Sequence, residues 1–162
     1  MDKLDQDIIL ELQKDGRQSY VDLAKLLGVT ETTVRNRVKH LVDKGTIKIT
    51  ALPDLEVLGY RFMSIVGMQV QLADLRRVAA QLSRYPNVCY LANVTGRYEL
   101  IAIIAARTSR EFADFMENVV SAIPSVVRTE TFVNLHIYKG QAVGLDTSNL
   151  VSHLDVSSLD MS

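Results

Sequence analysis

The spacing of apolar residues changes near residue 60, and this change limits the folds that the chain can adopt. Before it, apolar residues recur every three or four positions in three short stretches, which is the pattern of amphipathic helices. After it, alternating or continuous apolar runs of strand length are interleaved with two helical stripes. The sequence therefore predicts an α+β protein in which a small helical unit precedes a mixed unit.

The helical unit is expected to hold three helices, a tight connector and a short strand. Gly28 and Gly45 follow the second and third apolar stripes, where a glycine commonly ends a helix. Thr30 has the position of an N-cap for the third helix, which is expected to cover 31–44. Residues 46–50 alternate polar and apolar side chains and are predicted to form a strand. Helix, turn, basic helix and strand together indicate a winged helix-turn-helix.

The mixed unit is expected over residues 61–139 and has the pattern strand, helix, strand, twice over. The predicted strands cover 62–72, 88–94, 100–106 and 127–137, and the predicted helices follow apolar stripes at 75–82 and 112–123. Two such units form a ferredoxin-like βαββαβ sandwich, with both helices on one face of an antiparallel sheet. The opposite face then needs a cover, for which a partner subunit is the obvious candidate.

Two further regions complete the predicted domain organisation. The first domain, residues 1–60, includes a linker that begins near Pro53, because Pro53 and Asp54 break the preceding pattern. Residues 140–162 contain three aspartates and no Lys or Arg, so we interpret them as an acidic C-terminal tail. Their spaced leucines and many serines leave two interpretations open, a loosely held tail or a docking helix.

The third predicted helix gathers positive charge in a chain whose formal net charge is only -1. At about 100° per residue, its buried stripe leaves Thr32, Asn36 and Lys39 on the opposite face. An asparagine can bind adenine through two hydrogen bonds, and a threonine can contact a thymine methyl group. Arg35 and Arg37 flank the buried stripe, where DNA phosphates would run. The predicted DNA contacts are Arg17, Ser19, Thr30, Thr32, Thr33, Arg35, Asn36, Arg37, Lys39, His40, Lys44 and Lys48.

Two other interpretations remain open for this helix and for the chain. The polar face could be the solvated surface of an ordinary helical hairpin. Alternatively, the chain could be a small-molecule-sensing, oligomeric interaction module without DNA binding. Because the net charge is near zero, a general polyanion binder is not expected, so any contact with double-stranded DNA must be local.

The composition argues against several other classes of protein. No apolar run approaches the roughly 18 to 20 residues of a membrane span, and the first residues lack the pattern of a secretory signal. Cys89 is the single cysteine, and no Cys/His spacing indicates a metal site. Nothing in the sequence places two of the three histidines beside a carboxylate or Cys89. We therefore expect a cytoplasmic protein without catalytic residues, cofactor, metal or membrane contact.

Short motifs occur in a characteristic order along residues 1–139. Those of the first unit are Leu4-Asp5, Asp7, Ile9-Leu10, Asp15-Gly16-Arg17, Leu23-Ala24, Val29-Thr30, Val34, Arg37-Val38, Leu41, Gly45-x-Ile47 and Leu58-Gly59. The later ones are Gly96-Arg97-Tyr98-Glu99-Leu100, Thr131 and Lys139. This ordered set resembles the Lrp/AsnC family, the feast/famine transcription regulators of bacteria and archaea.

The resemblance implies a DNA-binding winged helix-turn-helix joined to a ligand-sensing, oligomerising domain called RAM. Members of the family pair through their sheets into homodimers, and dimers often assemble further, commonly as octamers. Amino acids or related small molecules bind between the dimers. On this chain the implied effector contacts are Gly96, Arg97, Tyr98, Glu99, Leu100, Thr129 and Thr131.

Two of these residues depart from the family's pattern. Glu99 stands where the family often has Asp, and Arg97 places a large basic side chain in the turn. Glu99 could hold the ammonium group of a ligand, and Arg97 could attract its carboxylate. Either residue could equally be plain surface or form a salt bridge between subunits.

Overall fold

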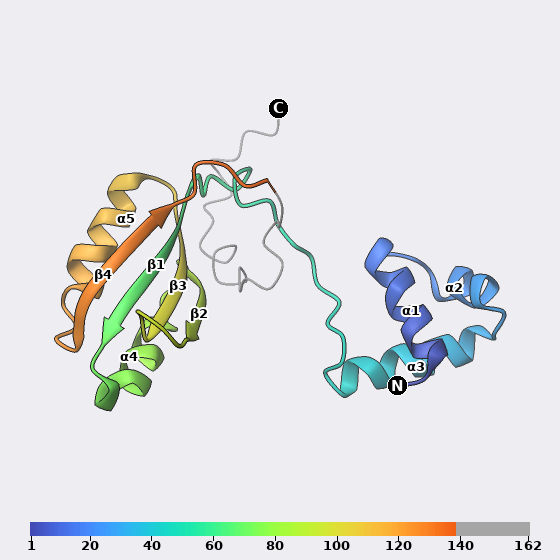
Figure 1. Ribbon diagram of the computed structural model, residues 1–162. Helices are drawn as coiled ribbons and strands as arrows, with labels where there is room; N and C mark the ends of the chain where they lie inside the picture. The colour runs from blue at the N-terminus through green and yellow to red at the C-terminus, as the bar shows by residue number, and fades with distance from the viewer. Residues whose placement is uncertain (139–162) are drawn as a thin grey trace. The chain divides into compact units, whose positions relative to one another are not determined.

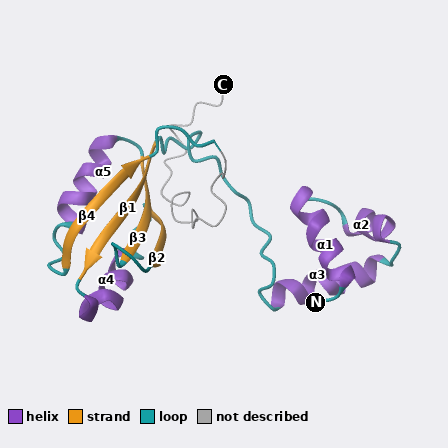
Figure 2. Ribbon diagram, in the orientation of Figure 1, coloured by secondary structure: helices purple, strands orange, loops and turns teal. Residues whose placement is uncertain are grey.

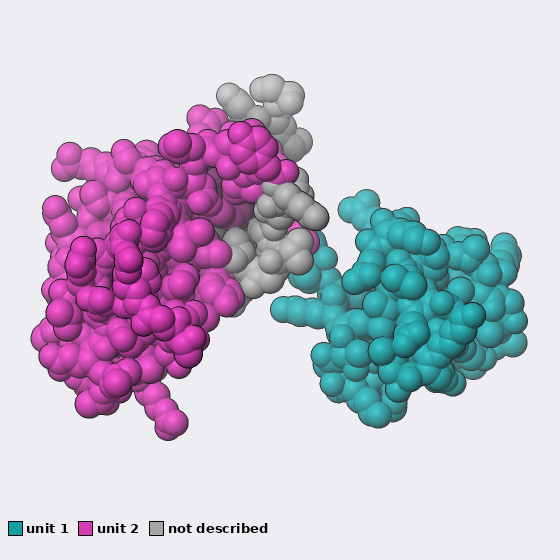
Figure 3. Space-filling view, in the orientation of Figure 1, with its two compact units in different colours: residues 1–51 teal, residues 52–162 magenta. Residues whose placement is uncertain are grey.

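The computed structural model describes residues 1–138 and divides the chain into two compact units. The first unit is Met1–Ala51 and the second begins at Leu52, coloured teal and magenta in Figure 3. The predicted acidic tail, 140–162, and Lys139 lie outside the described residues. Each unit has a hydrophobic core of its own, so the two are described separately.

Three helices form the first unit (Figure 1). They are α1 (Lys3–Lys14), α2 (Tyr20–Leu27) and α3 (Glu31–Asp43), and all three were predicted. Their apolar stripes meet in one core, whose buried residues are Ile8, Leu23, Ala24, Val34, Val38 and Leu41. Burial of a Val or Leu side chain contributes about 1.5–3 kcal/mol, so this small core is the main force that holds the three helices together.

The strand predicted for residues 46–50 is wrong. The backbone N–H groups of Thr46 and Ile47 instead donate to the carbonyl oxygen of Leu41, at 2.9 and 3.3 Å, and turn the chain at the end of α3. Alternating side chains specify a strand only where a second strand takes up its backbone hydrogen bonds, and residues 1–51 contain no strand. The helix-turn-helix is therefore present without an ordered strand as its wing.

In the second unit, the described residues form a four-stranded antiparallel sheet in the order β2-β3-β1-β4. The strands are β1 (Phe62–Val70), β2 (Val88–Asn93), β3 (Leu100–Ala106) and β4 (Val126–Val133). The helical segments are η1 (Leu72–Asp74), α4 (Leu75–Leu82), α5 (Ser109–Phe115) and the π-helical turn η2 (Met116–Val120) that continues α5. This order of elements confirms the predicted βαββαβ fold.

Two predicted strand boundaries are wrong. Leu72 was expected in the first strand, but it lies in η1 and is 75% exposed. The last strand was expected to reach Ile137, but β4 ends at Val133. Its partner β1 begins at Phe62, shortly beyond the Ser64 that pairs with Val133, and the Asn134 N–H already donates to the Met63 carbonyl at 3.0 Å. Strand length is set here by the partner, which the alternating pattern of one strand does not reveal.

Both helices cover the same face of the sheet (Figure 2). Residues opposite each other in antiparallel strands point to one face, so the register defines which side chains share the core. The core residues from the sheet are Val66, Met68, Val70, Leu100, Ala102 and Ile104, and those from the helical segments and the loop after η2 are Val78, Leu82, Phe115, Val120 and Ile123. This core fixes α4 and α5 against the sheet.

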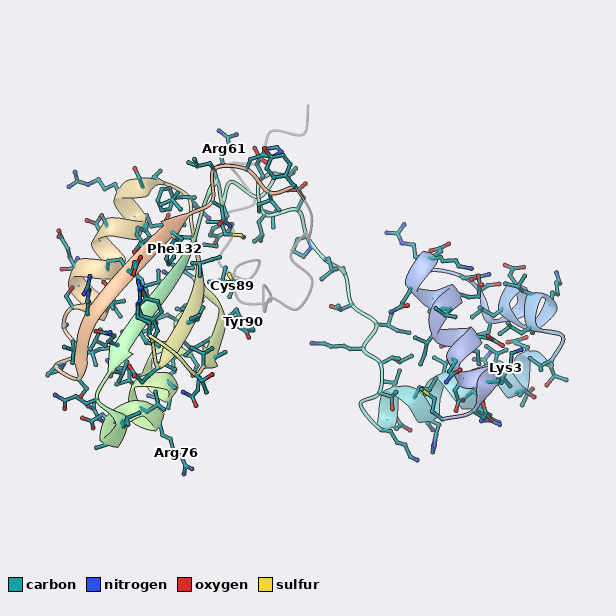
Figure 4. The ribbon with its side chains drawn as sticks, in the orientation of Figure 1. Lys3, Arg61, Arg76, Cys89, Tyr90 and Phe132 are labelled. Atoms are coloured by element: carbon teal, nitrogen blue, oxygen red, sulfur yellow. The ribbon has the colours of Figure 1, made fainter. Side chains whose placement is uncertain are left out.

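The other face of the sheet carries an apolar row that spans all four strands. The register aligns Tyr90, Ile103, Ile65 and Phe132 across β2, β3, β1 and β4. At the two ends of the row, Tyr90 is 43% and Phe132 is 50% exposed, and Figure 4 labels both side chains. Large apolar side chains in this exposed arrangement indicate an interaction surface.

The segment that precedes β1 covers one end of this open face. Leu55 and Tyr60 pack with Cys89 and Ala105 in a small separate cluster. Cys89 is 2% exposed, so it packs as a small buried hydrophobic residue. The segment therefore packs against the sheet as part of the second unit.

Candidate nucleic-acid interface and effector region

The turn between α2 and α3 has the geometry that a helix-turn-helix requires. The N–H of Asp22 donates to Ser19 Oγ at 3.1 Å, which caps the start of α2. Gly28 ends α2 with a φ of 67°, a left-handed conformation that favours glycine. Thr30 then caps α3 by accepting a hydrogen bond from the N–H of Thr33 at 3.2 Å. Two caps and one glycine thus set the sharp change of direction between the helices.

The outward face of α3 presents four exposed polar side chains. They are Thr32, Asn36, Lys39 and His40. Within the described residues, none of them makes a side-chain hydrogen bond or ion pair. Buried Val34 lies on the opposite side of the helix and holds α3 on its neighbours. These four side chains are therefore available to an external partner.

Apart from Arg35 and Arg37, the other predicted DNA contacts fall into two groups. Arg17, Lys44 and Lys48 are exposed, and their side chains have no polar partner in the part of the chain that the structure describes. The hydroxyl groups of Thr30 and Thr33 lie 2.8 Å apart and form part of the cap of α3. The hydroxyl of Ser19 donates to Asp22 Oδ2 at 2.6 Å. Capping thus already occupies these three hydroxyl groups.

Arg35 is held at the flank of α3 by two neighbours. Its Nη2 pairs with Glu31 Oε1, and its guanidinium carbon lies 5.4 Å from the centre of the Tyr20 ring. An arginine over an aromatic face gains a modest cation–π attraction. The side chain remains 60% exposed, so it can still contact a phosphate if it shares or releases Glu31.

Arg37 faces the start of α1. Its Nη1 donates to Asp2 Oδ2 at 2.7 Å and to Asp5 Oδ1 at 3.2 Å. The hydrogen bond from the Asp5 N–H, followed by the Arg37 guanidinium, lowers the pKa of Asp2, and the hydrogen bond and charge of Asp2 raise the pKa of Arg37. Of the predicted DNA contacts, Arg37 is thus the one whose ion pairs connect α3 to another helix.

The predicted effector turn folds onto the open face of the sheet. The Tyr98 ring lies over Gly67, and its hydroxyl group bonds to Glu130 Oε2. Arg97 Nη1 also approaches Glu130 Oε2, at 3.4 Å, and the Arg97 carbonyl accepts a hydrogen bond from Gln69 at 3.1 Å. Arg97 therefore forms an ion pair within the chain.

Glu99 is anchored to the end of β1. Its Oε2 accepts a hydrogen bond from the N–H of Val70 at 2.9 Å, and its own N–H donates to the Met68 carbonyl at 3.1 Å. Asn93 holds the Glu99 carbonyl with a 2.7 Å hydrogen bond. The second carboxylate oxygen makes no hydrogen bond within the described residues, so Glu99 keeps one acceptor for a ligand.

The remaining predicted effector residues lie elsewhere around the sheet. Gly96 is exposed at the tip of the turn. Thr129 and Thr131 are exposed on edge strand β4 and pair with Met68 and Val66, which places them on the helix-covered side rather than beside Tyr98. Leu100 is 1% exposed and belongs to the core. The structure thus divides the predicted set between two sides of the sheet.

Sequence reasoning missed five residues around these sites. Four acidic residues pair with predicted site residues, and Gly67 accommodates the Tyr98 ring. The acidic residues are Asp2, Asp5, Glu31 and Glu130. Gly67 gave a signal, because a glycine inside a strand often marks the close approach of another group. Glu31 gave one too, because it lies four residues before Arg35 on the same helix. The other acidic partners lie on different elements from the basic residues they meet, and single-sequence patterns do not pair such residues.

No helix in the described part of the chain is long and apolar enough to span a membrane. Residues 1–138 also contain no group of three or more His, Cys, Asp or Glu side chains that could hold a metal ion.

The fold and the exposed face of α3 define a class, the DNA-binding regulators that join a helix-turn-helix to a separate α+β unit. Family models agree with both halves. An AsnC-type helix-turn-helix domain matches residues 1–42, and the family described as "PF0864 C-terminal dimeric alpha+beta barrel domain" matches residues 60–146.

Individual relatives agree with the family models. The chain is 31% identical over 140 residues to the HTH-type transcriptional regulator FL11 of Pyrococcus horikoshii, covering 86% of this chain and 92% of the relative. The structure of AsnC from E. coli superimposes with a TM-score of 0.81 at 25% identity, over 87% of this chain and 96% of that one. The chain belongs to the Lrp/AsnC family and is a DNA-binding transcription regulator of that type.

A second solved structure supports the fold. The transcriptional regulator NMB0573 of Neisseria meningitidis, solved as a complex with L-Met, has a TM-score of 0.81 at 22% identity. The match covers 87% of this chain and 94% of that one.

Proposed function

We propose that α3 enters the major groove of double-stranded DNA, with Asn36 and Thr32 directed at base edges and Lys39 and Arg35 at phosphates. The observation that carries this proposal is the outward face of α3, where Thr32, Asn36 and Lys39 are exposed without partners in the described chain. An asparagine amide can read adenine through two hydrogen bonds, whereas a lysine ammonium attracts any phosphate. His40 lies near the same face and is a further candidate contact.

The experiment compares two substitutions on one helix. Asn36→Ala should reduce the discrimination between a selected binding site and a scrambled duplex, because it removes a base contact. Lys39→Ala should weaken binding to both duplexes similarly and reduce the slope of log affinity against log salt by about 0.9. An equal loss on every duplex for both variants would contradict the assignment of Asn36 to base reading.

The second candidate function is a small-molecule-sensing interaction module that does not use α3 for DNA. The intrachain partners of Arg35 and Arg37 favour this alternative, because pairing with Glu31, Asp2 and Asp5 reduces their availability. Salt dependence separates the two functions. Weak binding that does not change with salt, or with Lys39→Ala, would support the interaction module.

We also infer that a small molecule of the amino-acid type acts on the second unit, near the turn formed by 96–99. Two observations support this inference: the related regulator NMB0573 was solved with L-Met, and Glu99 keeps one carboxylate oxygen without a partner in the described chain. A free oxygen of that kind suits a ligand ammonium group. Thr129 and Thr131 are exposed on β4, on the helix-covered side of the sheet. They are candidate contacts that a neighbouring subunit contributes to the ligand.

A thermal-shift screen of amino acids tests the effector site. A ligand that raises the Tm of the wild type should lose that effect with Glu99→Ala. Glu117→Ala is the matched control and should keep the ligand shift, because Glu117 is exposed and makes no side-chain hydrogen bond or ion pair with other residues of the described chain. A ligand shift that is unchanged by Glu99→Ala would place the effector site elsewhere.

We further propose that two copies pair through their open sheet faces, that dimers assemble to octamers, and that the protein acts in the cytoplasm. The apolar row from Tyr90 to Phe132 supports the pairing, as does the word "dimeric" in the description of the matched domain family. Phe132→Asp should convert the dimer to monomers, measured as solution mass. The exposed substitution Leu72→Asp serves as control, and an unchanged mass for Phe132→Asp would exclude this face as the interface.

A further inference from the structure

Arg37 and two aspartates form a closed set of hydrogen bonds between α3 and the start of α1. Asp2 and Asp5 make the capping box of α1: the Asp5 N–H donates to Asp2 Oδ1 at 3.0 Å, and the Asp2 N–H donates to Asp5 Oδ2 at 3.1 Å. The two remaining oxygens, Asp2 Oδ2 and Asp5 Oδ1, both accept from Arg37 Nη1, at 2.7 and 3.2 Å. Every carboxylate oxygen of the two aspartates is therefore engaged.

The environment of this cluster gives it a fixed geometry. The Asp5 side chain is only 7% exposed, and a carboxylate removed from water requires a charged partner. Arg37 is 39% exposed and pairs with both aspartates through the same nitrogen. Its guanidinium is thus bound to the first turn of α1 and is not a loose surface charge.

The position of Arg37 in α3 gives this contact a consequence for DNA recognition. Arg37 follows Asn36 directly, so the two side chains leave the helix about 100° apart. Anchoring Arg37 to α1 therefore fixes the rotation of α3 about its axis, and with it the direction of Asn36. A side chain that reads a base edge needs this orientation, because a hydrogen bond weakens steeply when its angle is poor.

We propose that Asp2 and Asp5 are positioning residues for DNA recognition, which act through Arg37 to orient the base-reading face of α3. Arg37 accordingly belongs to the scaffold and neutralises no phosphate. The inference rests on the proposed major-groove role of α3. It assigns a favourable role in DNA binding to two acidic residues, although acidic groups near a polyanion normally weaken its binding.

The two explanations predict opposite changes in DNA affinity when the Asp2 charge is removed, and this difference provides the test. Asp2→Asn keeps an oxygen that can cap α1 but removes the charge that holds Arg37. If Asp2 positions α3, Asp2→Asn should bind the selected site more weakly, by roughly fivefold or more, and discriminate less against a scrambled duplex. Electrostatics alone predicts stronger binding to both duplexes, because a negative charge is lost.

Asp43→Asn is the matched control for the change of charge. Asp43 lies at the end of α3, is exposed, and makes no side-chain hydrogen bond or ion pair with other residues of the described chain. This variant should bind both duplexes equally or more tightly than the wild type. All binding is measured with the full chain at a temperature where circular dichroism finds each variant fully folded, so that loss of structure does not mimic loss of orientation.

The salt dependence of binding separates this inference from the proposed function. Asp2→Asn should keep the wild-type slope of log affinity against log salt, whereas Lys39→Ala should reduce it by about 0.9. If Lys39→Ala behaves as expected but Asp2→Asn binds as tightly as Asp43→Asn, the positioning role is wrong and the major-groove role stands. If neither Lys39→Ala nor Asn36→Ala alters binding, the proposed role of α3 itself is wrong.

Discussion

The Tyr98 ring lies directly on the backbone of Gly67, in the middle of strand β1. A Cβ atom at position 67 would lie 2.6 Å from Tyr98 Cδ2, closer than two carbon atoms can approach without displacement. The absence of a side chain at Gly67 thus allows the turn before β3 to fold onto the sheet. There the Tyr98 hydroxyl group reaches Glu130 on β4, two strands away from β3.

Gly67→Ala should therefore displace the ring and destabilise the second unit. Overpacking of this kind typically lowers the free energy of unfolding by about 1–3 kcal/mol, measured by denaturant titration. Tyr98→Ala in the same chain should relieve the clash, so the double variant should be more stable than the sum of the two single changes predicts. Additive effects would contradict a direct contact between these residues.

Thr30→Ala should destabilise the first unit without touching its core. The Thr30 side chain caps α3 through the N–H of Thr33, and loss of such a cap lowers the free energy of unfolding by about 1 kcal/mol. Thr30→Ser keeps the capping oxygen and is the control. If the alanine and serine variants unfold at the same denaturant concentration, the capping role of Thr30 is wrong.

The type and order of the regular elements could largely be predicted because they depend on local patterns. Thr30 was identifiable as a cap from its position before an apolar stripe, and this cap is present. The strand expected at residues 46–50 failed because a strand depends on a partner, and one sequence does not specify which distant segment supplies it. Local periodicity is thus a sound guide to helices and an incomplete one to strands.

The charged residues of the candidate sites were harder to predict for a related reason. The helical wheel placed Asn36 and Lys39 outward correctly, because their direction depends only on the spacing along α3. It gave no means to foresee that Arg37 would meet Asp2 from another helix, or that Arg97 would meet Glu130 from another strand. The pairing of long charged side chains depends on tertiary geometry, so basic residues were assigned to DNA or effector without knowledge of their acidic partners.

Ser125→Ala should lower the Tm of the second unit by about a few degrees. Ser125 is 4% exposed, donates to Asp74 Oδ2 at 2.6 Å and accepts from Arg77 Nη2 at 2.9 Å. The hydrogen bond from Ser125, followed by that from Arg77, lowers the pKa of Asp74. Ser125→Ala therefore also removes a hydrogen bond that stabilises the Asp74 carboxylate. Ser83→Ala, at an exposed position with one hydrogen bond to the Ala80 carbonyl, is the control and should change the Tm less.

The contribution of Asp2 to stability should disappear in acid. In the folded chain the pKa of Asp2 lies below its ordinary value of 3.8, first because of the Asp5 N–H and then because of Arg37. A carboxyl group whose pKa is lower in the folded state stabilises the fold above the unfolded value, and this stabilisation is lost as the pH falls through the folded value. Unfolding of the first unit, followed by helical circular dichroism or hydrogen exchange, should therefore separate wild type from Asp2→Asn at pH 6–7.

The two proteins should converge as the pH falls from 3.8 through the lower folded pKa of Asp2, where protonation removes the same charge that the substitution removes at neutral pH. Asp43→Asn is again the control, because its carboxylate makes no hydrogen bond or ion pair with other residues of the described chain. It should unfold like the wild type throughout this range. If the difference in unfolding between wild type and Asp2→Asn persists undiminished below the folded pKa of Asp2, Asp2 stabilises α1 through hydrogen bonds that do not need its charge. The attraction between the Asp2 carboxylate and Arg37 would then not be the cause.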